Sequence, residues 1–251
     1  KNIQVPISDH FHHVMEKSFY YHDISDGMFD VTIGPLYKLW GFQGREIINE
    51  PSKRKINKTL KFIGMDQLSL LGDPKTLDKK NTNVTIDLNA IAKGYAVDII
   101  SEYLKKEGYL EHFVEIGGEI KIQSNSNEDW GVGIQNPNQI GESIQEIYLS
   151  NKSIATSGNY FNYIEYLDTG SIKTHIINPL TGYPLEVKEG MISSASVIAD
   201  DCIDADALAT TLMLFDIDNG IKLIESLDGV EAYIIYLKDE NLQHIESSGF
   251  K

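Results

Sequence analysis

The chain contains a single cysteine, Cys202, among its 251 residues. No internal disulfide can form, and a zinc site built from several cysteines is excluded. Basic residues are also scarce, because 22 lysines and arginines stand against 37 acidic residues and give a formal net charge of −15. A surface this acidic repels phosphate backbones, so no nucleic acid partner is expected. A ligand that carries phosphates would need local positive charge, from a lysine or a metal ion.

Long hydrophobic runs and common nucleotide-binding signatures are absent as well. No stretch of about 18 apolar residues occurs, so no membrane-spanning helix is expected. The sequence has no Walker-type phosphate loop, no dinucleotide-binding glycine pattern and no Ser-His-Asp arrangement in a known order. Internal repeats and Pro- or Gly-rich linkers are missing too. This favours a single compact domain over residues 1–251, a length that one core can support.

Helical and strand patterns follow one another irregularly along the chain. Apolar residues at steps of three and four predict a helix over 9–23, and alternation over 84–88 predicts a strand that runs into a helix over 90–106. Because no regular βαβ alternation is present, the expected class is α+β. The remaining expectations are a loop leading into a short helix at 43–60, helices at 203–215 and 218–227, and strands at 112–135 (a pair), 146–149, 160–166, 172–177, 191–199, 230–236 and 241–246.

The junction between the predicted strand and helix at 87–96 (DLNAIAKGYA) is a candidate anion site. Helix N-termini present free N–H groups and a positive partial charge, and Lys93 in the first turn can reach a phosphate. Gly94 costs a helix about 1 kcal/mol relative to Ala, which close approach of a ligand or another backbone would explain. A tightly packed corner that begins at Asp87, with a solvated Lys93, explains the pattern equally well.

Asp206 and Thr210 are four residues apart in a predicted helix, so both side chains project from one face. Joined by a backbone carbonyl from elsewhere, the carboxylate and the hydroxyl would make an all-oxygen site suited to Mg²⁺ or Ca²⁺. The alternative is a carboxylate that favours the helix dipole and a threonine that bonds to its own helix. From the spacing alone, this structural alternative is favoured.

Histidines supply two further candidates. His175 ends a predicted strand before a Pro/Gly turn, where it could act as a general base, although a lone histidine is usually structural. Three histidines in the first predicted helix, His10, His12 and His13, could bind a metal, but solvated surface positions are the expected arrangement.

Taken together, these segments resemble the FAD:protein FMN transferases, the ApbE-type family. The matching motifs occur in the family's order: Gly27–Gly41 (GMFDVTIGPLYKLWG), Ile86–Asp98 (IDLNAIAKGYAVD), Ala155–Tyr183 (ATSGNY and HIINPLTGY) and Asp204–Leu212 (DADALATTL). The turn Gly117-Gly118-Glu119 matches as well. The resemblance extends from about residue 9 onward and implies an α+β, T-fold-like single domain. The sequence departs from many relatives at Asn89 and Asn178, where they carry Gly and Asp.

The resemblance also implies roles for individual residues. The backbone carbonyl of Ala90 and the side chains of Asp206 and Thr210 would bind Mg²⁺, which makes Asp206 catalytically essential. His175 would accept a proton beside the phosphates. The residues expected to contact FAD or line its pocket are Met28, Phe29, Asp30, Asp87, Lys93, Ile176 and Ile177.

The implied reaction is Mg²⁺-dependent cleavage of FAD, with transfer of FMN through a phosphodiester to a Ser or Thr of an acceptor flavoprotein and release of AMP. The acceptor would carry an Asp-Gly-x-Ser/Thr-Gly-Ala-Thr-like motif. Two alternatives are an FAD diphosphatase that uses water as the nucleophile and an FAD-binding carrier without chemistry. Relatives carry a lipid-attachment cysteine and a further strand–helix region before the first predicted helix. The resemblance therefore implies an extracytoplasmic lipoprotein of the bacterial cell membrane, with an anchor that is not in this sequence.

Overall fold

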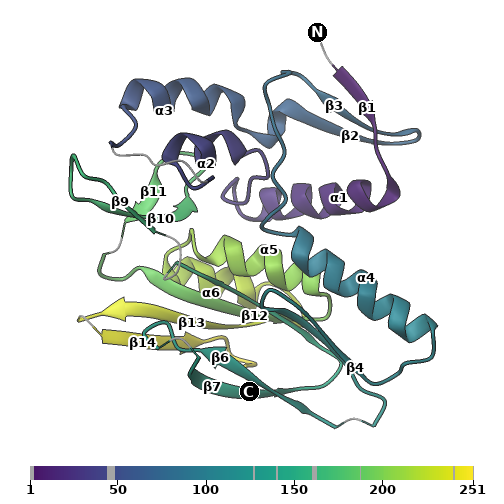
Figure 1. The fold of residues 1–251 in the computed structure, drawn as a ribbon. Coiled ribbons are helices and arrows are strands. Elements are labelled where there is room, and N and C mark those ends of the chain that lie inside the picture. Colours follow the sequence, from purple (N-terminus) through teal and green to yellow (C-terminus); the bar gives the residue numbers. More distant parts are fainter. Residues whose placement is uncertain are drawn as a thin grey trace. The chain divides into compact units, whose positions relative to one another are not determined.

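The computed structural model describes residues 3–43, 49–126, 128–139, 141–159, 163–186, 188–239 and 241–250 (Figure 1). Helices and strands are interleaved, which confirms the α+β class. The chain divides into two compact units: unit 1 is Lys1–Asn89 with Phe161–Val187, and unit 2 is Ala90–Tyr160 with Lys188–Lys251. Each unit has hydrophobic clusters of its own. A single catalytic domain over 1–251 stays a prediction.

Unit 1 combines two three-stranded antiparallel sheets with short helices. One sheet has the order β1 (Ile3–Pro6), β3 (Lys75–Lys79), β2 (Leu68–Gly72), and the other has the order β11 (Pro184–Glu186), β10 (Ile172–Ile177), β9 (Tyr163–Glu165). The helices are α1 (Asp9–Ile24), α2 (Gly34–Trp40) and α3 (Lys53–Thr59), followed by the 3-10 turns η1 (Leu60–Phe62) and η2 (Met65–Gln67).

Trp40, at the end of α2, is the centre of the unit 1 core and is fully buried. Its indole N–H donates to the carbonyl of Gly182 at 2.8 Å, and the hydroxyl of Tyr166 donates to the Trp40 carbonyl at 2.7 Å. A buried tryptophan combines a large apolar area with one N–H that needs a hydrogen-bond partner. Trp40 buries that area completely, and its N–H is paired with Gly182. The surrounding cluster contains Leu36, Trp40, Ile56, Ile63, Tyr166 and Ile177. These contacts hold the turn that follows β10.

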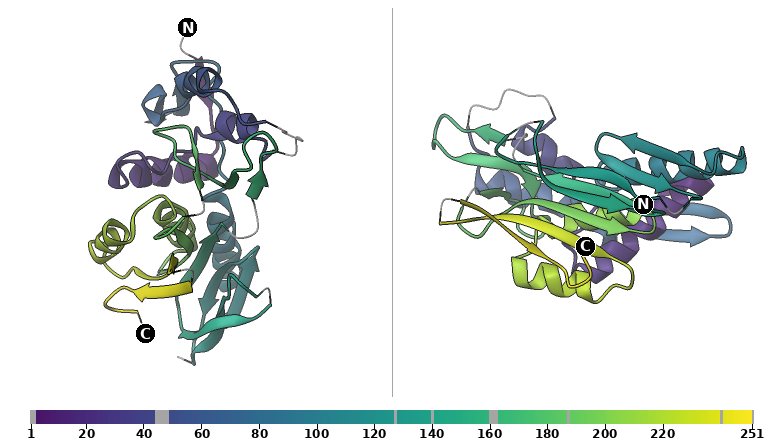
Figure 2. Two further views of the ribbon diagram at one scale, coloured as in Figure 1. Left: turned by 90° about the vertical axis from the view of Figure 1, so that its left-hand side faces the viewer. Right: turned by 90° about the horizontal axis from the view of Figure 1, so that it is seen from below.

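Unit 2 is built on a six-stranded antiparallel sheet with the order β14–β13–β12–β8–β5–β4. Its strands are β4 (His112–Ile116), β5 (Glu119–Gln123), β8 (Ser153–Gly158), β12 (Ile192–Ala199), β13 (Glu231–Lys238) and β14 (Asn241–Glu246). Helices α4 (Ala92–Lys106), α5 (Cys202–Leu212) and α6 (Ile217–Glu225) cover one face, and the hairpin β6 (Trp130–Gln135)–β7 (Ser143–Leu149) covers the other (Figures 1 and 2).

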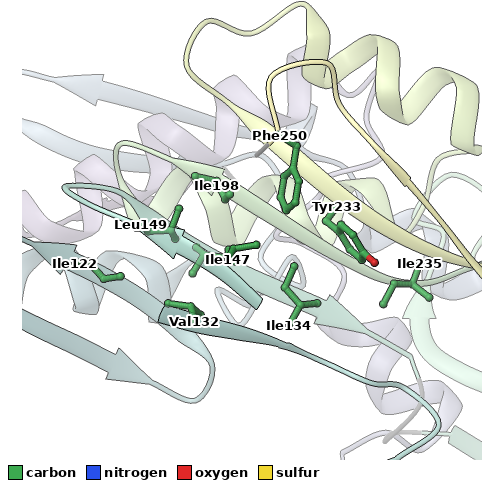
Figure 3. Close-up of a cluster of buried hydrophobic side chains, with 10 residues drawn as sticks. Ile122, Val132, Ile134, Ile147, Leu149, Ile198, Tyr233, Ile235 and Phe250 are labelled. Carbon is green, nitrogen blue, oxygen red and sulfur yellow. The ribbon is translucent and has the colours of Figure 1, made fainter. Parts of the chain in front are cut away.

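The central strand β12 is buried along its whole length because both faces of the sheet are covered. Successive side chains of a strand point to opposite faces, so one half of β12 packs toward the helices and the other toward the hairpin. Figure 3 shows the cluster between sheet and hairpin, which consists of Ile122, Val132, Ile134, Ile147, Leu149, Ile154, Ile198, Tyr233, Ile235 and Phe250.

Most predicted elements are confirmed within a few residues, but two expectations are wrong: no strand forms over 84–88, and residues 112–135 hold three strands, β4, β5 and β6, and not a pair. Residues 84–88 are extended but do not form a strand. The Asp87 N–H donates to the Val31 carbonyl at 2.7 Å, and this bond does not extend into a strand pairing. The helix predicted after this segment is confirmed and begins at Ala92, two residues later than expected. Part of two predicted segments, residues 44–48 and 160–162, lies outside the described residues. None of the helices in the described ranges is long and apolar enough to cross a bilayer.

Candidate functional site

Helices α4 and α5 of unit 2 meet at Gly94. A Cβ on Gly94 would lie 2.7 Å from the carbonyl carbon of Cys202 and 2.8 Å from the Cβ of Asp206. Side chains do not approach so closely, so any other residue would push the two helices apart. Of the two explanations for this glycine, close approach of another backbone is therefore the one that the structure supports.

Asp206 lies at the same contact and is 3% exposed. Its Oδ2 accepts a hydrogen bond from the Gly94 N–H at 2.9 Å. Burial raises the pKa of Asp206 to about 6, the Gly94 N–H lowers it, and the negative charge of Glu119 raises it further. A carboxylate in such surroundings is poorly stabilised as an anion, so a cation that reaches it would be held firmly.

Thr210 stands one turn after Asp206 on α5, which confirms that both residues share a helix face. Its Oγ1 lies 3.0 Å from the Oγ of Ser157 on β8. The Ser157 hydroxyl therefore orients Thr210 from the neighbouring strand. Ser157 belongs to the matching motif Ala155–Tyr183, and this contact places that motif beside α5.

Ala90 is positioned just before α4, and its backbone carbonyl loses the usual helical partner. The N–H four residues later belongs to Gly94 and donates to Asp206 instead. The bond that follows runs from the Tyr95 N–H to the Ile91 carbonyl at 3.2 Å. Unit 2 thus supplies a carboxylate, a hydroxyl and a carbonyl without that N–H, and Mg²⁺ prefers oxygen donors of this kind. Within the described ranges, no group of three or more His, Cys, Asp or Glu residues could hold a metal. The three groups named here include only one of these residue types, the carboxylate of Asp206.

Lys93 forms an ion pair with Glu119, which belongs to the matching turn Gly117-Gly118-Glu119 and for which no role was predicted. Glu119 follows the turn Gly117-Gly118, whose φ angles of 63° and 103° favour glycine at both positions. Its side chain is 3% exposed, whereas that of Lys93 is 44% exposed. Burial raises the pKa of Glu119, and the hydrogen bond from Lys93 opposes that effect. The β4–β5 turn therefore delivers a buried carboxylate to the first turn of α4.

Asp98 fastens α4 to α5 at a second point. Its two carboxylate oxygens accept the N–H groups of Cys202 and Ile203, each at 2.9 Å, and Lys121 donates to Oδ1 at 2.7 Å. The residue at the N-cap position of α5, Asp201, makes no side-chain cap bond. The first turn of α5 is therefore capped from α4, an arrangement that the local sequence does not predict.

In unit 1, Asp87 lines a pocket of about 400 Å³. Gly34 lines the same pocket beside Asp87, since a Cβ there would lie 3.3 Å from Thr85 Oγ1 and 3.6 Å from Asp87 Cβ. Lys38 supplies a cation to the same pocket, which contains Gly34, Pro35, Lys38, Gln43, Thr85, Ile86 and Asp87. An anionic or polar ligand group therefore has both an acceptor and a cation at this place.

The segment Met28-Phe29-Asp30 is held rigidly in unit 1. Oδ1 of Asp30 accepts both the N–H and the hydroxyl of Thr32, at 2.7 and 2.6 Å, and burial raises the pKa of Asp30. Phe29 is buried against the ring of Tyr21, with ring centroids 6.0 Å apart. Phe29 thus fixes its two neighbours, which are more accessible than Phe29 itself.

Met28 lies beside the turn that follows β10, since its sulfur is 3.7 Å from Nδ2 of Asn178. His175 on β10 is half-buried, while Ile176 and Ile177 are buried and Ile177 belongs to the core cluster around Trp40. The structure therefore brings Met28 close to the end of β10. The binding roles of these residues stay predictions.

The predicted site residues fall into two groups, one in each unit. Unit 2 holds Ala90, Lys93, Asp206 and Thr210, and unit 1 holds Met28, Phe29, Asp30, Asp87, His175, Ile176 and Ile177. Among the α1 histidines, His10 and His13 are exposed as expected. The expectation is wrong for His12, which is buried because its face of α1 packs inward. Its Nδ1 lies 3.2 Å from the carboxylate of Glu16, one turn later on the same helix.

Comparison with known proteins points to one family. A family model described as the ApbE family matches residues 1–234. A relative from Vibrio cholerae named FAD:protein FMN transferase is 34% identical over 243 residues, which is 95% of this chain and 70% of the relative. One of the same name from Haemophilus influenzae is 32% identical over 257 residues, covering 100% and 72%.

Solved structures agree in fold. The flavin transferase ApbE from Vibrio cholerae superposes with a TM-score of 0.84 at 30% identity, over 99% of this chain and 78% of that one. The apo form of the flavinyl transferase ApbE from Pseudomonas stutzeri gives 0.84 at 30% identity, over 98% and 75%. The expected ApbE-type fold is confirmed.

Proposed function

Because the chain belongs to the ApbE family, we propose that it is an FAD:protein FMN transferase, an enzyme that moves the FMN half of FAD onto another protein. The observation that carries the proposal is the contact between α4 and α5. It sets the buried carboxylate of Asp206 against the first turn of α4, with Thr210 one turn farther along α5. This contact forms inside a chain whose named relatives match over nearly its whole length.

The residues of unit 2 fit a magnesium ion. The Ala90 carbonyl, the Asp206 carboxylate and the Thr210 hydroxyl would hold it, and support comes from their oxygen chemistry and from the raised pKa of Asp206. A bound Mg²⁺ would polarise the phosphoryl oxygens and offset the charge on the leaving AMP. Lys93 adds a point charge for the diphosphate at the start of α4. An anionic substrate can thereby bind to a protein with a net charge of −15.

In the transfer step, a Ser or Thr hydroxyl of the acceptor attacks the FMN-side phosphorus, and the bond from this phosphorus to the bridging oxygen breaks. FMN becomes joined to the acceptor by a phosphodiester, and AMP leaves. His175 takes the hydroxyl proton, since a neutral imidazole is a suitable base near neutral pH. In unit 1, the pocket at Asp87 and Lys38 and the rigid segment 28–30 bind parts of the flavin nucleotide.

The acceptor is a flavoprotein with an Asp-Gly-x-Ser/Thr-Gly-Ala-Thr-like motif, and the enzyme works outside the cytoplasm on a lipid anchor. These two parts of the proposal rest on the resemblance of the sequence motifs alone.

Product analysis tests the proposal. The chain is incubated with FAD and Mg²⁺, with and without an acceptor flavoprotein, and FAD, FMN and AMP are separated by chromatography. A transferase releases AMP in step with acceptor and leaves little free FMN. Equal amounts of free FMN and AMP without acceptor would identify a diphosphatase instead. Unsplit FAD in both mixtures would identify a carrier.

A further inference from the structure

The two carboxylate oxygens of Glu119 differ in their hydrogen bonding. Oε1 pairs with Lys93, and Oε2 is buried with no hydrogen-bond partner within the described part of the chain. Buried polar atoms are normally satisfied, and an exception calls for an explanation. A glutamate kept only for packing would be replaced by an apolar residue without that cost. We therefore look for the role of Glu119 in its pairing with Lys93 and not in packing.

The pairing restrains a side chain that would otherwise move freely. Lys93 has a long, flexible side chain that is 44% exposed, and Glu119 is fixed by the tight turn Gly117-Gly118 at the start of β5. Ordering a lysine costs conformational entropy, so a fixed carboxylate holds the ammonium group in place before any ligand arrives. The Cδ of Lys93 also passes 3.7 Å from the Cβ position of Gly117, which confines it to the same turn.

The pairing also cancels the charge that Lys93 brings. Lys93 carries one positive charge and Glu119 and Asp206 carry one negative charge each when ionised, which leaves one net negative charge at the start of α4. An FAD diphosphate is repelled by this set. A divalent cation reverses the sign to one net positive charge, and the diphosphate is then attracted.

We propose that Glu119 is the positioning residue of Lys93 and that, by neutralising this lysine, it makes FAD binding depend on a divalent cation. The inference rests on the proposed function, because it concerns the same phosphate site. Glu119 itself does not touch the reacting atoms. It aims Lys93 and prevents the lysine from holding FAD before the metal is present.

The test compares FAD binding with Mg²⁺ and with EDTA, together with kcat and KM for FAD in the transfer reaction. The variants are Glu119→Gln, Lys93→Gln and the double variant. Glu111→Gln is the matched control, because it removes the same charge from an exposed position just before β4. Circular dichroism and thermal melting confirm that each variant is folded.

Glu119→Gln should bind FAD in EDTA roughly threefold to tenfold more tightly than the natural chain, because the charge of Lys93 is released. Its kcat should fall while its KM for FAD does not rise, because the lysine is no longer aimed. Lys93→Gln should move the metal dependence in the opposite direction, and the double variant should lose the gain. Glu111→Gln should change neither quantity.

Weaker FAD binding by Glu119→Gln, by the same factor with Mg²⁺ and with EDTA, would assign Glu119 a purely structural role and overturn the proposal. Unchanged binding in both media would overturn it too. If Glu119→Gln does not fold, Lys93→Gln provides the test. A ratio of FAD affinities with and without Mg²⁺ that is the same in Lys93→Gln as in the natural chain would then contradict the proposal. FAD binding can be measured without any FMN transfer. A chain that binds FAD but transfers no FMN would therefore refute the proposed function, while the role of Glu119 could still be tested.

Discussion

The Asp206 carboxylate accepts the backbone N–H of Gly94 at 2.9 Å, and this bond joins helix α5 to the first turn of helix α4. The two residues are 112 positions apart in the chain. One oxygen of Asp206 is thereby committed to holding the helices, and the proposed metal site would use the other. The bond also takes the N–H that the Ala90 carbonyl would receive in a regular helix. A single contact thus prepares two of the proposed metal ligands.

Asp206→Asn and Asp206→Ala should separate these two uses of the side chain. Both variants should lose Mg²⁺-dependent FAD cleavage by at least about a hundredfold, because neither offers a carboxylate. The asparagine can still accept the Gly94 N–H through its carbonyl, whereas alanine leaves that buried donor unpaired and should cost about 1–3 kcal/mol of stability. Urea unfolding and initial rates measure the two effects. Full activity in the asparagine variant would remove Asp206 from the metal site.

The raised pKa of Asp206 predicts how the metal-free protein responds to pH. A group with a raised pKa binds its proton more tightly in the folded state, so this contribution to stability is present below about pH 4 and is lost as pH rises to about 6. The loss is at most about 3 kcal/mol, from the size of the shift.

Asn at position 206 stays neutral, so Asp206→Asn should gain stability over the natural chain through that window when both are unfolded by urea in EDTA. A difference that stays constant from pH 4 to 7 would mean that Asp206 is not destabilised as an anion.

Gly94→Ala should destabilise the chain, although alanine is the better helix former by about 1 kcal/mol. The new methyl group would meet the carbonyl of Cys202 and the side chain of Asp206, and overpacking of this kind costs about 1–3 kcal/mol or more. Gly220→Ala in α6 is the graded control, because there the methyl group meets mainly the flexible end of Leu212 at 3.1 Å. Thermal melting should show a clearly larger loss for Gly94→Ala. Equal losses would contradict the tight contact at Gly94.

Asp98→Ala should cost more stability than Asp201→Ala, even though Asp201 occupies the N-cap position of α5. Asp98 accepts two N–H groups of α5 and is largely buried, so its loss should cost about 1–2 kcal/mol. Asp201 makes no cap bond, and its exposed pair with Lys121 is worth less than about 1 kcal/mol. Chemical unfolding of the two single variants measures the order, and the reverse order would reject the cap from α4.

His175→Ala should slow FMN transfer far more than it weakens FAD binding, because a base acts on the acceptor hydroxyl in the transition state. Single-turnover rates and equilibrium titration of FAD measure the two quantities separately. Equal losses in both would make His175 a binding residue.

Local patterns predicted the parts of the site that depend on one segment. The spacing of Asp206 and Thr210 defined a helix face, and the sequence around Lys93 predicted a helix N-terminus; α5 and α4 bear these out. The pattern over 84–88 misled because side-chain alternation also occurs in extended chain that pairs with no neighbouring strand. The cap by Asp98 and the pairing of Glu119 with Lys93 could not be predicted, since each joins residues brought together only by the packed sheet and helices.

The most direct measurement is the intact mass of an acceptor flavoprotein after incubation with FAD, Mg²⁺ and either the natural chain or Asp206→Asn. The natural chain should add one FMN phosphoryl group to the acceptor, and the asparagine variant should leave the acceptor unmodified under the same conditions. An acceptor that stays unmodified with the natural chain would contradict FMN transfer, and one that is modified equally by both proteins would contradict the role of Asp206.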